Sequence, residues 1–60
     1  MIIRINEKEG IVTLEWANNK ETYRFDNIES DGTVMVFTRK GACSVEVPRT
    51  YGVWVWEAKL

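Results

Sequence analysis

The 60-residue chain contains no histidine, one cysteine and one proline. Without histidine, the commonest general base and metal ligand is missing, and a single cysteine can build neither an internal disulfide nor a zinc site. A domain of this size also has little volume for an enclosed pocket. We therefore expect a non-enzymatic protein with no catalytic residues, no metal site and no cofactor.

The chain also lacks a dominant charge and a long apolar run. Its 8 basic and 9 acidic residues give a formal net charge of -1, which provides no global field to attract nucleic acid or an anionic membrane. The N-terminal Met1-Ile2-Ile3-Arg4 has neither the basic start nor the apolar core of a signal peptide. Together with the lone Cys43, which suits a reducing compartment, these features favour a soluble cytoplasmic protein.

What the chain does contain is β-branched and aromatic residues, in short runs separated by turn residues. This pattern predicts a single all-β domain over residues 1–60. We expect five or six antiparallel strands that curl into a small barrel, with the first and last strands closing it. The expected strands are residues 2–6, 11–17, 20–28, 33–39, 42–47 and 53–57.

Three turns predict which side chains face the core. Two-residue loops at residues 18–19 and 40–41 and a four-residue loop at 29–32 set the register of neighbouring strands, and all three place apolar residues on one face. Cys43 also falls on this face, where a small core side chain is the expected role. The expected core contains Val12, Leu14, Phe25, Val36 and Val45.

The same registers leave two apolar residues on the solvent-facing side. Met35 and Phe37 fall there, beside Arg24 and among mainly polar neighbours. An apolar island on a polar face indicates a contact surface.

The last strand, Val53-Trp54-Val55-Trp56, is apolar on both faces. A strand with one solvated face alternates apolar with polar residues, so this strand needs cover on both sides. The barrel interior can cover one pair of side chains, and a partner would cover the other. For Trp16, as for the two tryptophans of this strand, burial in the core is the competing interpretation.

The segment Val47-Pro48-Arg49-Thr50-Tyr51-Gly52-Val53 resembles the end of SH3 domains, where Pro-x-x-Tyr in a 3₁₀ turn leads into a short closing strand. The preceding hairpin, residues 31–47, is also spaced like the distal hairpin of that family. The resemblance implies an SH3-like barrel with a 3₁₀ turn near Pro48 and Tyr51, two residues that would line a peptide groove. The first half lacks the Ala-Leu-Tyr-Asp-Tyr segment, an acidic RT loop and the groove tryptophan, so the resemblance implies the topology and not recognition of PxxP ligands.

The leading functional hypothesis is a protein-interaction module that binds a protein partner or itself, as a homodimer, through its aromatic edge. Its small size suggests an accessory or inhibitor protein of a phage or mobile element. The candidate partner-binding residues are Met35, Phe37, Tyr51, Trp54, Trp56, Arg24 and Arg49.

The alternative hypothesis is a nucleic-acid-binding barrel. Small barrels bind single strands by stacking bases on aromatic side chains above a basic track. Here Phe37 and Met35 would form the platform. The basic residues around it would be Arg24, Arg39, Lys40 and Arg49.

Overall fold

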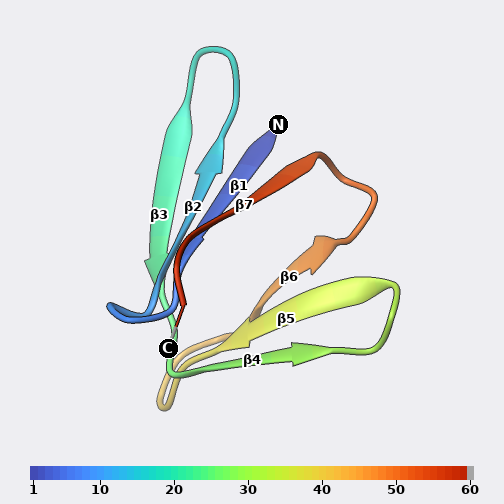
Figure 1. Cartoon of the computed structure of the whole chain (residues 1–60). Coiled ribbons are helices and arrows are strands. Elements are labelled where there is room, and N and C mark those ends of the chain that lie inside the picture. The colour runs from blue at the N-terminus through green and yellow to red at the C-terminus, as the bar shows by residue number, and fades with distance from the viewer. Residues whose placement is uncertain (60) are drawn as a thin grey trace.

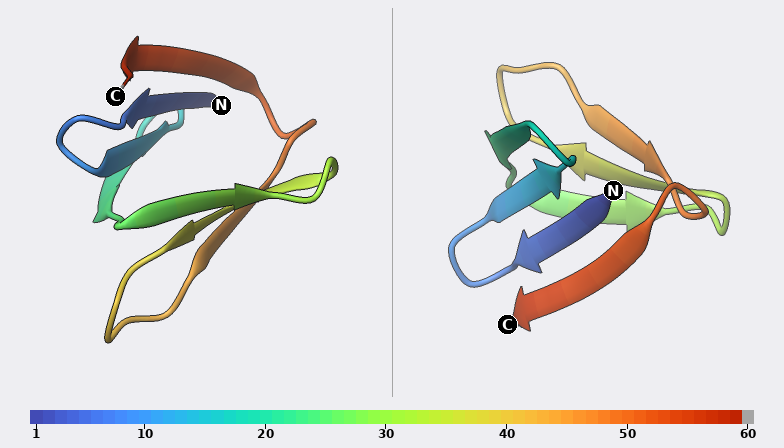
Figure 2. Two further views of the ribbon diagram at one scale, coloured as in Figure 1. Left: turned by 60° about the horizontal axis from the view of Figure 1, so that its bottom comes forward. Right: turned by 90° about the horizontal axis from the view of Figure 1, so that it is seen from above.

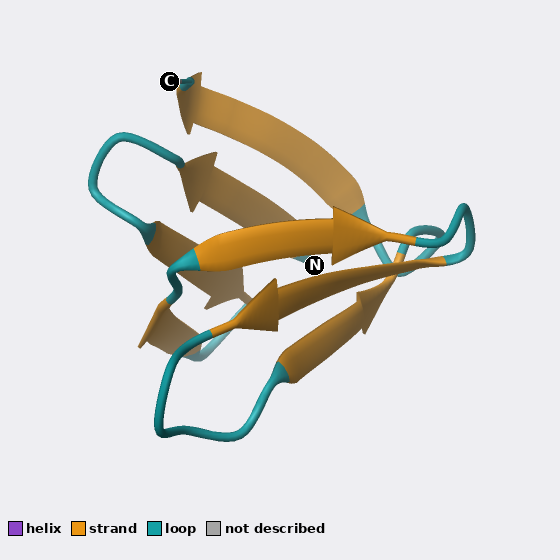
Figure 3. Cartoon of the chain, turned by 90° about the horizontal axis from the view of Figure 1, so that it is seen from below, coloured by secondary structure: helices purple, strands orange, loops and turns teal. Residues whose placement is uncertain are grey.

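The computed structural model describes residues 1–59 and shows two β-sheets (Figure 1). The described residues contain strands and loops but no helix, and thus none suited to crossing a membrane (Figure 3). The all-β prediction is confirmed. The strands are β1 (Ile2–Asn6), β2 (Ile11–Glu15), β3 (Lys20–Arg24), β4 (Asn27–Ser30), β5 (Val34–Thr38), β6 (Val45–Pro48) and β7 (Val53–Ala58).

The seven strands form a four-stranded sheet in the order β3-β2-β1-β7 and a three-stranded sheet in the order β4-β5-β6. The sheets face each other as the two walls of a small barrel-like globule (Figure 2). No ladder within residues 1–59 joins β3 to β4 or β6 to β7, so the barrel is not closed. The first and last strands do pair, but they run parallel, whereas we expected antiparallel strands throughout.

The strand expected over residues 20–28 is broken where the chain passes from one sheet to the other. The Phe25 N–H donates to the Gly10 carbonyl at 2.8 Å, and the next N–H, of Asp26, donates to the Thr38 carbonyl at 2.7 Å. Gly10 has a φ of 68°, and a Cβ there would lie 2.6 Å from the Phe25 carbonyl oxygen. Only glycine combines this conformation with so close an approach.

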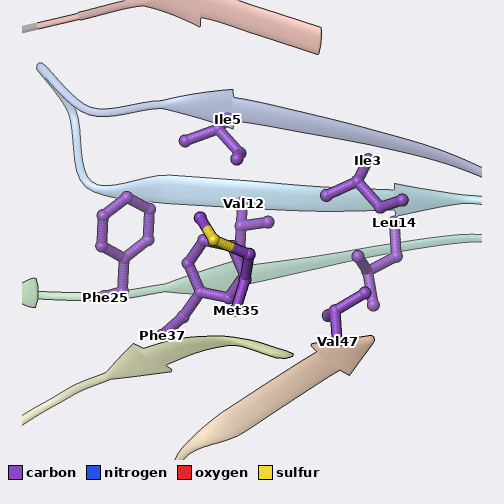
Figure 4. Close-up of a cluster of buried hydrophobic side chains, with 8 residues drawn as sticks. All are labelled: Ile3, Ile5, Val12, Leu14, Phe25, Met35, Phe37 and Val47. Carbon is purple, nitrogen blue, oxygen red and sulfur yellow. The ribbon is translucent and has the colours of Figure 1, made fainter. Parts of the chain in front are cut away.

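The core lies between the two sheets (Figure 4). The rings of Phe25 and Phe37 pack at a centroid distance of 5.3 Å and an angle of 57°, a favourable tilted arrangement that links the sheets. The predictions for Val12, Leu14 and Phe25 are confirmed. The buried residues are Ile3, Ile5, Val12, Leu14, Phe25, Met35, Phe37 and Val47.

The predicted faces of β5 are wrong. Met35 and Phe37 are buried, whereas Val36 lies opposite Glu46 on the outer face and is half-buried. Val45 pairs with Phe37 and packs against the core from a half-buried position. A register slip of one residue reverses every side chain of a strand, and the β5–β6 pairing differs from our expectation by one residue.

The loop between β5 and β6 causes this slip. It spans residues 39–44 instead of turning tightly at 40–41, with Gly41 at a φ of 81° and the Ala42 N–H donating to the Arg39 carbonyl at 3.1 Å. Asp26 holds the loop by accepting the Lys40 N–H at 2.9 Å. Cys43, expected in the core, is therefore exposed in this loop.

The β2–β3 hairpin also turns earlier than expected, but the consequence is different. The Trp16 N–H donates to the Asn19 carbonyl at 2.7 Å, so the loop is residues 17–18 and Tyr23 pairs with Val12 instead of Leu14. A shift of two residues keeps each side chain on its face. Trp16 lies beyond the ladder and is 40% exposed, so it is not a core residue.

Alanine substitutions on the two faces of β5 test its orientation. Phe37→Ala should lower the free energy of unfolding by about 3 to 5 kcal/mol because it empties the centre of the core. Val36→Ala, on the outer face, should cost about 1 kcal/mol or less. Urea denaturation of both variants measures the difference, and equal losses would contradict the orientation described here.

The side chain of Asp31 stabilises the turn of the β4–β5 hairpin. One carboxylate oxygen accepts the N–H of Thr33 at 2.9 Å, the N–H of Val34 at 2.8 Å and the Thr33 hydroxyl at 2.9 Å. These hydrogen bonds, that of the Thr33 N–H first, favour the ionised carboxylate and lower the pKa of Asp31 below its ordinary value.

The lowered pKa of Asp31 predicts a pH-dependent contribution to stability. The contribution is present above the ordinary carboxyl pKa of about 3.9 and is lost as the pH falls through the lower pKa of the folded state. Asp31→Asn removes the titrating group, so its unfolding midpoint should fall less than that of the wild type on acidification. Urea midpoints measured from neutral pH into the acidic range make the comparison, and parallel curves would refute it.

Candidate functional site

A cavity of about 160 Å³ opens between the sheets where β6 and β7 diverge. The two strands meet at the turn of residues 49–52 and separate from it (Figure 2). Met35, Arg49, Trp54 and Trp56 line the cavity. Drug-sized ligands occupy about 300 to 1,000 Å³, whereas a cavity of about 150 Å³ accepts benzene. The space therefore suits one apolar side chain and not a cofactor.

Trp54 forms the inner wall of the cavity in a fixed orientation. It lies on the inward face of β7, opposite Ile3 of β1, and packs against the core. Its indole N–H donates to the Arg49 carbonyl at 2.9 Å. Trp54 is half-buried, and its indole N–H finds a partner in the turn that leads into its own strand.

Arg49 lines the cavity, and both its main chain and its side chain are held by hydrogen bonds. Its backbone N–H donates to the Thr33 carbonyl at 2.8 Å, and its Nη1 donates to the Ser30 hydroxyl at 2.9 Å. Both partners belong to the β4–β5 hairpin region, so Arg49 connects the turn before β7 with the three-stranded sheet.

Trp56 forms the outer wall and is the accessible aromatic residue of the site. It occupies the next inward position of β7, opposite Ile5, and is 39% exposed. The Nζ of Lys59 lies 5.4 Å from its ring centroid, within cation–π range. The cavity wall thus combines the Trp56 ring with one cation, Arg49, and a second cation, Lys59, lies beside that ring.

β7 has a free edge beside the cavity. Within residues 1–59 it pairs with β1 alone, and the Val53 N–H donates to the Met1 carbonyl at 3.0 Å. Because successive residues of a strand direct their N–H and C=O groups to opposite sides, those of Trp54 and Trp56 face away from β1. Gly52 permits this start, since a Cβ there would lie 2.2 Å from the Met1 oxygen.

The edge strands differ in how well they resist pairing with another chain. Charged side chains and proline protect sheet edges. β3 carries Lys20, Glu21 and Arg24, β4 carries Glu29, and β6 carries Glu46 and ends at Pro48. β7 is uncharged from Val53 to Trp56. It is therefore the least protected edge among the described strands.

The second apolar side of β7 is its outer face. Val53 is 62% exposed and lies opposite the half-buried Ile2, and the half-buried Val55 is the next outward residue of β7. The salt bridge between Arg4 and Glu15 borders this strip. The strip is thus apolar and partly open to solvent, as the double-sided pattern of the strand predicted.

The structure brings together four of the seven predicted site residues, namely Met35, Arg49, Trp54 and Trp56. Tyr51 lies in the adjoining turn. Its N–H donates to the Pro48 carbonyl at 3.0 Å, so a hydrogen-bonded turn occupies the position where we expect a 3₁₀ turn. The other two are elsewhere: Phe37 in the core and Arg24 on the edge strand β3. Lys59 was missed, because a lysine near a chain end has no distinctive sequence signal.

The residues of the nucleic-acid hypothesis do not form the expected platform. Phe37 and Met35 are buried, so neither ring nor thioether is available for stacking. Arg24 lies on β3, whereas Arg49 lies in the turn before β7. The observation on which that hypothesis rested is therefore absent from the described structure.

One further pair of titratable side chains is linked by a hydrogen bond away from the cavity. Tyr23 donates its hydroxyl to the Glu21 carboxylate, and this bond raises the pKa of the phenol. Both residues lie on the edge strand β3, outside the cavity. Residues 1–59 contain no cluster of three His, Cys, Asp or Glu side chains that could hold a metal ion.

No protein-family model, curated protein or solved structure matches the chain. The SH3-like topology thus stays a prediction from the segment of residues 47–53 and the hairpin before it. The cavity and the free edge of β7 are the features of the structure that bear on function.

Proposed function

We propose that the protein is a non-enzymatic interaction module that binds an extended segment of polypeptide along the free edge of β7. One observation carries the proposal: the same two residues serve the edge and the cavity. Trp54 and Trp56 line the cavity with their side chains and direct their main-chain N–H and C=O groups to the open edge.

An added strand would use both features at once. Its main chain would pair with Trp54 and Trp56 and supply affinity, while its alternate side chains would point toward the cavity and supply specificity. The volume of about 160 Å³ favours a segment with one apolar side chain at the position over the cavity. Arg49 in the cavity wall and Lys59 beside the Trp56 ring favour a segment without basic residues near these two cations.

This mode of binding fits an accessory or inhibitory role in the cytoplasm, because such proteins act by occupying a surface and not by chemistry. An SH3-like topology would agree with it, since the exposed Tyr51 lies in the same turn as Arg49, which lines the cavity. The proposed binding mode uses only the cavity and the free edge of β7, whatever the topology of the barrel.

Selection from a display library of short linear peptides tests the proposal. Peptides that bind should share an apolar residue, and Trp56→Lys should weaken their binding at least about tenfold, as expected for an aromatic residue at the centre of an interface. Trp16→Lys is the matched control, because Trp16 is 40% exposed against 39% for Trp56 and lies at the end of the β2–β3 hairpin.

Isothermal titration calorimetry with the selected peptides gives the affinities, and circular dichroism checks the fold of both variants. Raising the salt concentration should change peptide affinity little, whereas phosphate contacts would weaken steeply. Equal losses in the two variants would refute the proposal, and so would the absence of peptide enrichment by a wild type that is monomeric at the concentration used.

A further inference from the structure

We infer that a second copy of this chain occupies the edge of β7, with the two β7 strands paired antiparallel about a two-fold axis through Val55. This inference rests on the proposed function of the edge and names its occupant. It follows from the symmetry of the free hydrogen-bonding groups, from the charges near them and from the apolar strip behind them.

The free groups of the edge are self-complementary. They belong to Trp54 and Trp56, which lie on either side of Val55. In an antiparallel pair centred on Val55, each Trp54 lies opposite the partner's Trp56 and exchanges both main-chain hydrogen bonds with it. Val55 faces itself at the position where no ladder bonds form. An identical strand therefore satisfies every free group of the central pair without a change of register.

The charges allow this pairing. Like charges directly opposite each other on neighbouring strands are destabilising. The run from Val53 to Trp56 is uncharged, and the next residue, Glu57, falls opposite Val53 of the other copy. No like charges therefore meet across the axis, whereas a β3 edge paired with itself would place its lysine, glutamate and arginine in the contact.

The apolar surfaces of β7 also gain contacts in this arrangement. On the outer side the two Val55 side chains meet, and the partly exposed strip formed by Ile2, Val53 and Val55 becomes continuous across the axis. On the inner side each Trp56 gains the partner's Trp54 as a cross-strand neighbour. The interface is isologous, so it closes at two copies and uses up the edge.

Cysteine cross-linking tests the register. In a Cys43→Ser background, Val55→Cys should give a covalent dimer under mild oxidation, because opposite residues at non-hydrogen-bonded positions have Cα atoms about 4.5 Å apart, within the range of about 4.4 to 6.8 Å for disulfides. Val53→Cys is the matched control: Val53 is more exposed, yet its two copies lie several residues apart in this register. Cross-linking of Val53→Cys at an equal or higher rate would overturn the inference.

Analytical ultracentrifugation tests the assembly itself. The wild type and Trp16→Lys should sediment as dimers from low to high micromolar concentration, and Trp56→Lys as a monomer. If Trp56→Lys fails to fold, the cysteine pair still decides. A monomeric wild type that binds selected peptides through Trp56 would refute the second copy and leave the interaction function standing. A monomeric wild type that binds none would refute both, and a dimer that persists in folded Trp56→Lys would assign the contact to another surface.

Discussion

The parallel ladder between β1 and β7 is the constraint on which the rest of the structure depends. Gly52 lets the chain approach the Met1 carbonyl, and the Val53 N–H donates a hydrogen bond to this carbonyl. The bond fixes the phase of β7, that is, which of its residues face the interior. That phase directs Trp54 and Trp56 inward and Val53 and Val55 outward. It also decides which main-chain groups remain free. A shift of one residue would exchange both sets at once, so the cavity, the open edge and the outer strip have one common origin.

Several parts of the fold follow from local sequence alone. The first strand has the expected bounds, 2–6, and the β2–β3 hairpin places Val12 and Leu14 in the core although its loop is displaced. Alternation of apolar and polar residues specifies the faces of a strand, and a shift of an even number of residues preserves them. Local alternation was therefore enough to assign the buried face of the β2–β3 hairpin.

β5 shows where such reasoning fails. Its sequence, Val-Met-Val-Phe-Thr, is apolar at the first four positions, so periodicity cannot choose its buried face. The choice depends on the loop at residues 39–44, which Asp26 holds from a distant part of the chain. The break after Arg24 is similar, because it requires Gly10 to accept a hydrogen bond from Phe25. Contacts between segments distant in sequence decide both features.

The sequence predicted part of the candidate site, in some cases from a correct strand pattern and in one case from a wrong one. Trp54 and Trp56 were identified from the double-sided apolar strand, and Arg49 lies in the segment that suggested the turn. Met35 belongs to the site although its predicted face was wrong, because it reaches the cavity from the core side.

The parallel arrangement of the terminal strands also has a mechanical consequence. β1 begins and β7 ends at opposite ends of the same ladder. Force applied through residues 1 and 59 therefore acts along the strand axes and loads the hydrogen bonds between β1 and β7 in shear. The bonds share the load instead of opening one after another, as they would in a hairpin pulled from its open end. The ladder thus acts as a clamp that resists extension of the chain until its bonds rupture together.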